Sequence, residues 1–239
     1  MRYLKLSVLL MPILFYSTAF AARPLVTDDF GTVEKGRFEI EAGSYSTAQS
    51  AGGNTAGSAL FQAKYGLFES FDLGIEMPYS LSLPVGFGDA LVCAKLKLAE
   101  FGDNDGLSLR AGVKLSNADA SSGLGTGYAD YSFLAIYSRE ISGFRTHYNI
   151  GYTLVGVPSG AAEANVINYS AAMEKEVYPG ADIVLEFFGS STSYAPSNGS
   201  VQIGGRWQVD PSYRVDTGYS VDIDNNSQDT ATIGVTFTL

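Results

Sequence analysis

The sequence predicts an all-β fold, a transmembrane antiparallel up-and-down β-barrel of about 12 strands. Three observations predict it. Segments of roughly ten residues alternate apolar and polar side chains, the connectors between them alternate in length, and aromatic residues gather beside the short connectors. A strand turns successive side chains to opposite faces, so this alternation places two different solvents on its two sides. Behind a secretory signal, those solvents are lipid outside and water inside.

Residues 1–21 have the features of a secretory signal peptide. Arg2 and Lys5 supply a basic start, an apolar run follows, and Ala19-Phe20-Ala21 is a small-x-small cleavage site. A transmembrane anchor is the alternative, but the run contains Pro12 and no helical pattern follows it. No later run approaches the ~20 apolar residues that a membrane-spanning helix needs. We therefore expect the signal to be removed and the mature chain to cross a membrane as strands.

Residues 22–35 precede the first predicted strand and are mixed in charge. Arg23, Asp28 and Asp29 are the candidate plug residues, and we expect Asp28 and Asp29 to face Arg and Lys residues of the lumen. The segment either folds into the barrel as a plug or lies outside as a periplasmic tail. A barrel of about twelve strands has a narrow bore, below the 16 to 18 strands that leave an open channel. A plug at this place would therefore control access to the lumen.

Twelve segments with a period of two follow in residues 36–239, which form the barrel domain. They are rich in the aromatic and β-branched residues that favour strands. Their apolar faces are, in chain order, Phe38, Ile40, Ala42; Ala59, Phe61, Ala63, Tyr65, Leu67; Phe71, Leu73, Ile75, Met77, Tyr79; Ala90, Val92, Ala94, Leu96, Leu98; Leu109, Ala111, Val113, Leu115; Tyr131, Phe133, Ala135, Tyr137; Phe144, Tyr148, Ile150, Tyr152, Leu154; Ile167, Tyr169, Ala171, Met173; Ile183, Leu185, Phe187; Val201, Ile203, Trp207; Tyr213, Val215, Tyr219, Val221; and Ala231, Ile233, Val235, Phe237, Leu239. The sixth and ninth segments are less regular, because Leu134, Ile136, Val184 and Phe188 place apolar groups on the lumen side as well.

The connectors give an independent indication, because bacterial barrels alternate short periplasmic turns with longer outer loops. The long, flexible connectors are residues 46–58, 80–88, 116–127, 156–164, 189–200 and 224–229. The tighter connectors between them are residues 66–70, 99–106, 139–143, 177–181 and 210–212. With a periplasmic N-terminus, all the long connectors face outward.

Aromatic residues beside the short turns and the C-terminus predict a belt at the periplasmic rim of the membrane. They are Tyr65, Phe68, Phe71, Phe101, Tyr137, Phe144, Tyr178, Trp207, Tyr213 and Phe237. A soluble β-sandwich or lipocalin-like barrel also alternates and also uses aromatic residues. About twelve full-length strands with aromatic residues at one set of ends are difficult to place around one compact core.

The faces opposite the apolar ones predict a polar lumen that carries both signs of charge. Most of these residues are expected to pair across strands and stiffen the barrel. A water-filled pathway that selects solutes by charge is the alternative. The candidate lumen and selectivity residues are Lys95, Lys97, Arg110, Lys114, Arg145, Glu186, Arg206 and Arg214, of which the first four lie on adjacent predicted strands and could form one positive wall.

Composition excludes several function classes. The formal charge of −10 becomes −12 once Arg2 and Lys5 leave with the signal, and an acidic chain argues against nucleic acid as a partner. The single Cys93 lacks a disulfide partner and is expected to pack inside a strand. No cluster of His and Cys, metal-ligand spacing or Gly-rich phosphate loop predicts a metal or a cofactor.

His147, the only histidine, is the candidate base of a catalytic site. A hydrolase needs a nucleophile and a base in hydrogen-bond contact, with a third group that orients the base. His147 has no serine two residues away, although Ser132 or Ser170 on an adjacent strand could approach it. We expect a lumen residue here and no enzyme.

The mature start resembles the opening of the meta-pathway phenol-degradation family of outer-membrane proteins. The residues that carry the resemblance are Ala22-Arg23-Pro24-Leu25-Val26-Thr27-Asp28-Asp29, Gly31-Thr32-Val33, Lys35-Gly36-Arg37-Phe38-Glu39-Ile40-Glu41, Leu73-Gly74-Ile75-Glu76-Met77-Pro78-Tyr79 and Gly86-Phe87-Gly88-Asp89. The resemblance implies a transporter or porin barrel that passes small, often aromatic or hydrophobic compounds inward. The chain departs from the usual pattern at its end, which is Leu239 where barrels usually have Phe.

The sequence as a whole thus predicts a passive channel in the outer membrane of a Gram-negative bacterium. Its expected partners are outer-membrane lipid, the outer-membrane assembly machinery and a small-molecule solute, with no cofactor. A structural or ligand-binding barrel without an open pore is the main alternative, and an outer-membrane hydrolase is the third.

Overall fold

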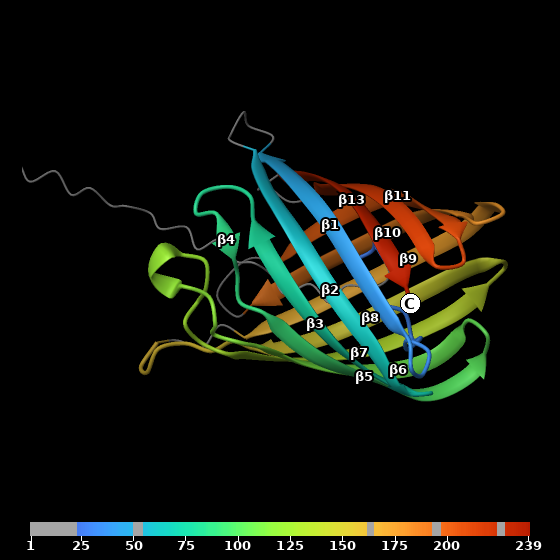
Figure 1. Ribbon diagram of the computed structural model, residues 1–239, viewed down its shortest axis with the longest axis horizontal. Helices are drawn as coiled ribbons and strands as arrows, with labels where there is room; N and C mark the ends of the chain where they lie inside the picture. The colour runs from blue at the N-terminus through green and yellow to red at the C-terminus, as the bar shows by residue number, and fades with distance from the viewer. Residues whose placement is uncertain (1–22, 50–54, 162–164, 193–196, 224–227) are drawn as a thin grey trace, which may run out of the picture.

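The computed structural model describes residues 23–49, 55–161, 165–192, 197–223 and 228–239. The predicted signal peptide, residues 1–21, and residue 22 lie outside these ranges. The chain folds into an antiparallel β-barrel with strands tilted against its long axis (Figure 1). The strands are β1 Phe38–Gln49, β2 Ala56–Phe68, β3 Phe71–Ser80, β4 Gly86–Phe87, β5 Leu91–Gly102, β6 Asp105–Lys114, β7 Asp130–Ile141, β8 Phe144–Leu154, β9 Val166–Tyr178, β10 Ala181–Thr192, β11 Asn198–Asp210, β12 Tyr213–Asp222 and β13 Gln228–Thr238, with one 3-10 turn, Ala120–Ser122.

The long strands pair in chain order and the first closes on the last. β1 pairs with β2 on one side and with β13 on the other, in a register that joins Ile40 to Phe237 and Ala42 to Val235. Backbone hydrogen bonds of 2.9 and 2.8 Å between Phe38 and Leu239 complete the closure. The predicted twelve-strand antiparallel barrel is confirmed, and β4 is a short addition to it.

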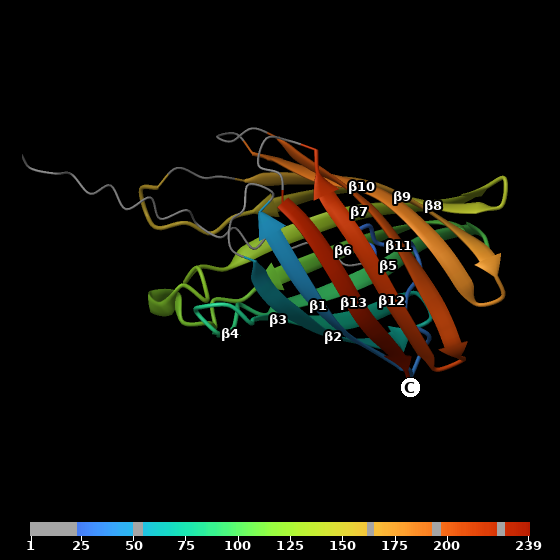
Figure 2. The same ribbon diagram turned by 90° about the horizontal axis from the view of Figure 1, so that it is seen from above.

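The connectors alternate between two ends of the barrel, as predicted. Each connector at the C-terminal end is a tight turn, at residues 69–70, 103–104, 142–143, 179–180 and 211–212. The strand ends that the longer connectors join lie at the opposite end, as does the 3-10 turn (Figures 1 and 2). The tight turns are shorter than expected, because the strands continue to pair beyond the point where their apolar alternation stops; of the long connectors, those after β6 and β8 are slightly longer than expected.

The wall differs from a uniform ladder between β3 and β5. Their pairing stops at Glu76↔Leu91, and β4 pairs instead with Tyr79 and Ser80 at the end of β3. Pro78 has no amide N–H, while its carbonyl accepts from Gly88 N at 2.9 Å. Pro78 therefore interrupts the ladder between β3 and β5. The alternation of side chains did not predict β4, which pairs beyond this interruption.

Apolar side chains cover the outside of the barrel and polar side chains fill the inside. Phe61, Ile150, Ile203 and Ile233 are exposed on the outer surface, whereas the buried residues are mostly polar. This inversion of a soluble core is the pattern of a barrel surrounded by lipid. Aromatic rings of the expected belt meet near the tight turns, with centroids 5.1 Å apart for Tyr213 and Phe237. Within the described ranges, no helix is long and apolar enough to cross a membrane.

Candidate functional site

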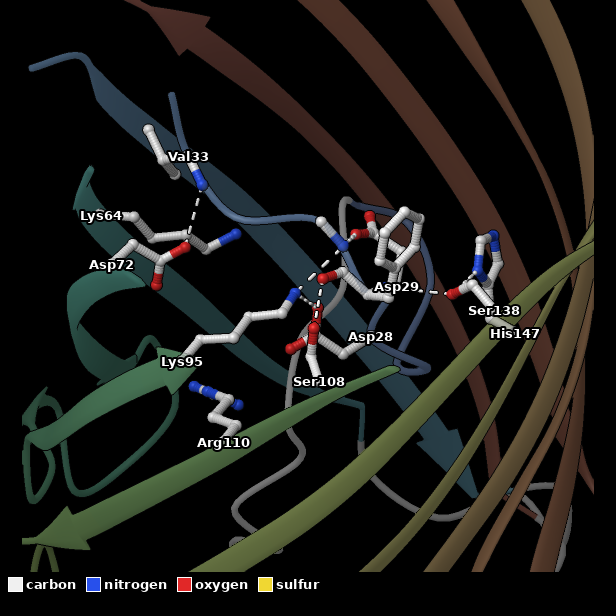
Figure 3. A network of polar contacts seen from close by, with 12 residues as sticks. Asp28, Asp29, Val33, Lys64, Asp72, Lys95, Ser108, Arg110, Ser138 and His147 are labelled. Atoms are coloured by element: carbon white, nitrogen blue, oxygen red, sulfur yellow. Dashed lines mark hydrogen bonds and ion pairs between the residues drawn. The ribbon is translucent and has the colours of Figure 1, made fainter. Parts of the chain in front are cut away.

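Residues 23–35 lie inside the ring of strands, where they run along the lumen before β1 begins (Figure 2). We call them the inserted segment. At its end, Lys35 bridges to Gly66, and Gly36 N donates to Gly66 O at 2.7 Å. Val33 N donates to the Asp72 carboxylate at 3.0 Å, as Figure 3 shows. The segment is thus joined to the wall at the tight-turn end and continues inward from there.

Arg23 begins the described part of the inserted segment and contacts three strands. Its Nε lies 3.4 Å from Asp216 Oδ2 on β12, in an ion pair with side chains 2% and 0% exposed. Its other nitrogens donate to Tyr45 on β1 and, at 2.6 Å, to Thr232 on β13. The guanidinium lies over two glycines, Gly43 and Gly234, where a Cβ would overlap it. The missing side chains of the wall therefore make the space that this arginine occupies.

Glu186 on β10 binds the next part of the segment. Its carboxylate accepts from Val26 N at 3.0 Å, from Thr27 Oγ1 at 2.5 Å and from Thr27 N. Gln202 Nε2 donates both to Pro24 O at 2.7 Å and to Glu186 at 3.2 Å. Glu186 is only 1% exposed. A buried carboxylate needs such donors, and here the inserted segment supplies three of them.

Two aspartates continue the segment and meet one lysine. Lys95 Nζ lies 2.8 Å from Asp28 Oδ1 and 3.8 Å from Asp29 Oδ1. Figure 3 shows both carboxylates turned toward this lysine. Partial burial raises the pKa of Asp29, but the charge of Lys95, followed by those of His147 and Lys64, outweighs burial and lowers the pKa to about 2. Asp29 is therefore ionised at neutral pH and holds the segment by charge.

Phe30 is fixed by both its backbone and its ring. Its N–H donates to Ser138 Oγ at 3.0 Å, and its carbonyl accepts from Ser108 Oγ. The ring forms a buried apolar cluster with Leu134 and Ile136. These two residues made the sixth predicted segment irregular, and the structure gives the reason: they form a socket for Phe30.

Leu25 occupies a second socket, which Ala172 and Val184 form. Val184 is one of the two residues that made the ninth predicted segment irregular, and it is fully buried. Burying a leucine or phenylalanine side chain stabilises by roughly 1.5–3 kcal/mol. The inserted segment is therefore held by apolar contacts as well as by charge.

Each predicted cation of the proposed positive wall has a carboxylate partner. The partners are Asp28 for Lys95 at 2.8 Å, Glu100 for Lys97 at 2.6 Å, Glu76 for Arg110, and Asp130 for Lys114 at 2.8 Å. All four face the lumen; Lys97 lies nearest the tight turns, with its Nζ 5.9 Å from the centroid of the Phe30 ring. The structure does not bring the four together as free positive charges, and one of them, Lys95, holds the inserted segment. Cys93 is buried beside Arg110, with Nη2 3.2 Å from Sγ.

Arg145, Arg206 and Arg214 come together at the tight-turn end of the lumen. Arg145 lies 2.9 Å from Glu174 and 2.7 Å from Asp182, and Arg206 pairs with the same two carboxylates. Arg214 donates to Thr236 Oγ1 at 3.3 Å.

His147 connects this cluster to the inserted segment. Its Nε2 lies 2.9 Å from Glu174 Oε1, and its Nδ1 lies 2.8 Å from the Oγ of Ser138, which also accepts from Phe30 N. The serine that approaches His147 is therefore Ser138, not Ser132 or Ser170 as considered from the sequence. A serine, a histidine and a glutamate in series have the composition of a hydrolytic triad. Here, however, Ser138 is 0% exposed, below Phe30.

The inserted segment separates two cavities of the lumen. The outer cavity, about 220 Å³, has Val26 of the segment among its lining residues. The cavity toward the tight turns, about 370 Å³, is lined by Asp29 and Phe30 of the segment and by Arg145, Arg206 and Arg214. Among the described residues, no group of three or more His, Cys, Asp or Glu side chains could hold a metal ion.

The sequence indicated Arg23, Asp28 and Glu186, but not the residues that bind them or the segment's apolar anchors. Leu25, Thr27 and Phe30 carry no charge and gave no signal. The apolar residues on the lumen face of β7 and β10 were the one available indication of a partner inside the barrel. Ser108 and Ser138 lie on the lumen face of their strands and could not be distinguished from ordinary polar lining.

Comparison with known proteins shows similarity to solved outer-membrane channels. An outer-membrane channel from Pseudomonas putida F1 aligns with a TM-score of 0.68 and 13% identity over 88% of this chain and 98% of that chain. The NanC porin aligns with a TM-score of 0.66 and 12% identity over 84% of this chain and 100% of that one. The KdgM porin, solved in complex with disordered oligogalacturonate, aligns with a TM-score of 0.61 and 8% identity over 82% of this chain and 98% of that chain. No family model and no curated protein matches the sequence. At these identities the likeness establishes the fold, which is that of outer-membrane β-barrels.

Proposed function

We propose that this chain is a channel in the outer membrane of a Gram-negative bacterium, through which small solutes diffuse inward, and that residues 22–35 are its plug. The observation that carries the proposal is the position of the inserted segment between two cavities of one lumen. The wall holds most of the segment through the side chains of the strands, which bond to the segment's side chains and backbone, so the segment can leave without breaking the strand ladder. The solved channels of similar fold support the same reading.

The mechanism is passive. A lumen lined by polar and charged groups lowers the free energy that a solute needs to cross the hydrocarbon layer, and no energy source takes part. The bore and the charge pattern select among solutes. Once the segment withdraws, the apolar sockets of Leu25 and Phe30 are free, and they offer contacts to the aromatic or hydrophobic compounds that the family resemblance implies.

Single-channel recording in planar bilayers tests the proposal. The full chain is compared with a variant that lacks residues 22–35, both refolded and checked for heat-modifiable mobility on gels. We expect rare or small conductance steps from the full chain and frequent, larger steps from the deletion variant. Equal conductance in the two proteins would contradict the proposal that the segment is a plug. A folded deletion variant without conductance steps would contradict the proposal that the barrel is a channel.

A structural or ligand-binding barrel without a pore is the second candidate. The filling of the lumen by residues 23–35, with apolar anchors as well as ion pairs, favours it. The same recording decides, because such a barrel stays silent after the segment is deleted.

We infer that the Ser138–His147–Glu174 series is a binding network and not an active site. Ser138 is fully buried and accepts the N–H of Phe30, while Glu174 also binds two arginines. A fluorophosphonate probe is therefore expected to leave Ser138 unlabelled, and the His147→Ala variant is expected to show the same lack of lipid hydrolysis as the native chain. Labelling that disappears in a Ser138→Ala variant would establish an enzyme instead.

A further inference from the structure

The outer cavity differs in chemistry from the rest of the lumen. Six of its lining side chains are uncharged hydrogen-bonding groups from four neighbouring strands, namely Ser132, Asn149, Thr153, Asn168, Ser170 and Ser190. The cavity toward the tight turns, by contrast, is lined by three arginines and four carboxylates. A solute in the outer cavity therefore meets hydroxyl and amide groups before it meets charge.

The two charged residues of the outer cavity are already engaged. Arg110 forms an ion pair with Glu76, and Asp222 accepts from Ser200 Oγ at 2.6 Å. An ionic solute in this cavity would find no opposite charge without a partner of its own, and burying an unpaired charge is costly. The cavity therefore favours molecules without net charge.

Several of the neutral groups have capacity for further hydrogen bonds. Asn168 Nδ2 makes a long contact of 3.4 Å to Thr153 Oγ1, and Ser190 Oγ donates to Asn198 Oδ1 at 2.8 Å. An amide has two donors and two acceptor sites, and a hydroxyl one donor and two. The group around Asn168 and Thr153 can thus both donate to and accept from a ligand's hydroxyls.

Apolar groups cover another part of the wall. Phe188 on β10 lies in register with Ser170 of β9 and Ser200 of β11, and all three face the lumen. Leu91 and Leu134 add aliphatic surface, and Val26 of the inserted segment completes this lining. A sugar ring fits such a wall, because it presents C–H groups to an aromatic face and hydroxyls to polar side chains around its edge.

We propose that the outer cavity binds one uncharged, polyhydroxylated molecule the size of a monosaccharide. The cavity of about 220 Å³ admits a single small ligand of this kind. This inference rests on the proposed channel for its biological role, since a solute held here is one step from the inserted segment. Because Val26 borders the cavity, the bound molecule lies against the segment that must move for passage.

Equilibrium binding to the refolded full chain in detergent tests the inference. Isothermal titration compares D-glucose with two charged relatives, glucosamine and glucuronate, and with phenol. We expect glucose to bind at least tenfold more tightly than either charged sugar and more tightly than phenol. Equal binding of the three sugars, preference for a charged sugar or preference for phenol would each overturn the proposal.

Two variants locate the binding. Thr153→Val keeps the side-chain shape and removes the hydroxyl, and Asn168→Leu removes the amide, so each should weaken glucose binding at least fivefold. Gln208→Leu, in the other cavity, is the matched control and should leave the affinity unchanged. Circular dichroism and heat-modifiable mobility verify the fold of each protein, and Thr153→Val alone decides if Asn168→Leu does not fold. Unchanged affinity in a folded Thr153→Val protein would contradict the site.

Conductance measured on the same preparations separates this inference from the proposed function. Glucose binding to a barrel that never conducts would support the binding site and contradict the channel. A conducting barrel that binds no glucose would support the channel and contradict the binding site.

Discussion

Glu186 carries an unusual share of the contacts at the residue scale. It is buried, its described hydrogen-bond partners are neutral, and three of the donors belong to Val26 and Thr27. A hydrogen bond to a charged group contributes about 1.5–3 kcal/mol, so the loss of this acceptor is expected to weaken docking. Its bonds hold Val26 in place, and Val26 lines the outer cavity.

Replacing Glu186 with glutamine should release the segment. The amide NH₂ would face backbone N–H donors, and losing about 3 kcal/mol would raise the undocked population by roughly two orders of magnitude. Single-channel recording should show a higher open fraction for Glu186→Gln than for the native chain. The control is Glu176→Gln on β9, whose carboxylate accepts only from the turn residue Gly180 at 2.8 Å among the described residues. An equal effect of both substitutions would show that Glu186 does not act through the segment.

Phe30 gives the second residue-scale prediction. Phe30→Ala should weaken docking by about 3–5 kcal/mol, because it empties the socket of Leu134 and Ile136. The midpoint of heat-modifiable mobility should fall for this variant. Phe101→Ala at the exposed rim removes a ring of the same size and should shift the midpoint less. A larger shift of the midpoint for Phe101→Ala would show that the aromatic belt stabilises the barrel more than the Phe30 ring in the lumen does.

At the element scale, β1 and β13 are shaped for the segment that lies on them. Gly43 and Gly234 leave a space that the Arg23 side chain fills. The three atoms nearest to a Cβ built at Gly43 all belong to Arg23. The glycine is thus a feature of the interior surface and not of the strand's own conformation.

Gly43→Val should therefore displace Arg23 while the barrel still folds. We expect its conductance to approach that of the variant without residues 22–35. Gly205→Val on β11 is the matched control, since the nearest atom to a Cβ there is the Asp182 carbonyl oxygen at an ordinary 3.5 Å. Native-like conductance of a folded Gly43→Val protein would mean that the segment docks without Arg23.

The strands themselves were predictable, whereas the docking of the segment was not. Alternation and turn chemistry are local patterns, so β1 and β13 can each be predicted from their own residues, without knowing that the two strands pair. The partners of the segment are distant in the chain, as Arg23 and Asp216 are, and no local pattern links them. The apolar lumen residues Ile136 and Val184 looked like defects of alternation, and only the folded ring shows that they face Phe30 and Leu25.

The whole molecule combines an apolar exterior with an interior that contains several buried ion pairs. The ion pair of Arg23 with Asp216 and that of Lys95 with Asp28 are almost completely buried. The Debye length falls from about 10 Å at 0.1 M salt to about 3 Å at 1 M, so added salt weakens the attraction between exposed charges, but that within buried pairs much less. The closed state should therefore tolerate high ionic strength.

Raising KCl from 0.1 to 1 M should increase any conductance only in proportion to the bulk solution. The deletion variant, recorded in parallel, gives that proportional reference. Large steps that appear in the full chain at 1 M KCl, without a matching change in the reference, would show that the segment is held mainly by exposed charge.

The contacts of Arg23 also set an order of events during biogenesis. This residue touches β1, β12 and β13, and β1 and β13 are the neighbouring strands that no connector joins. Its complete binding place exists only after the first strand has met the last. A newly made barrel would accordingly close its ring first and receive the segment last, and for that interval each new molecule would be a transient leak in the membrane that it enters.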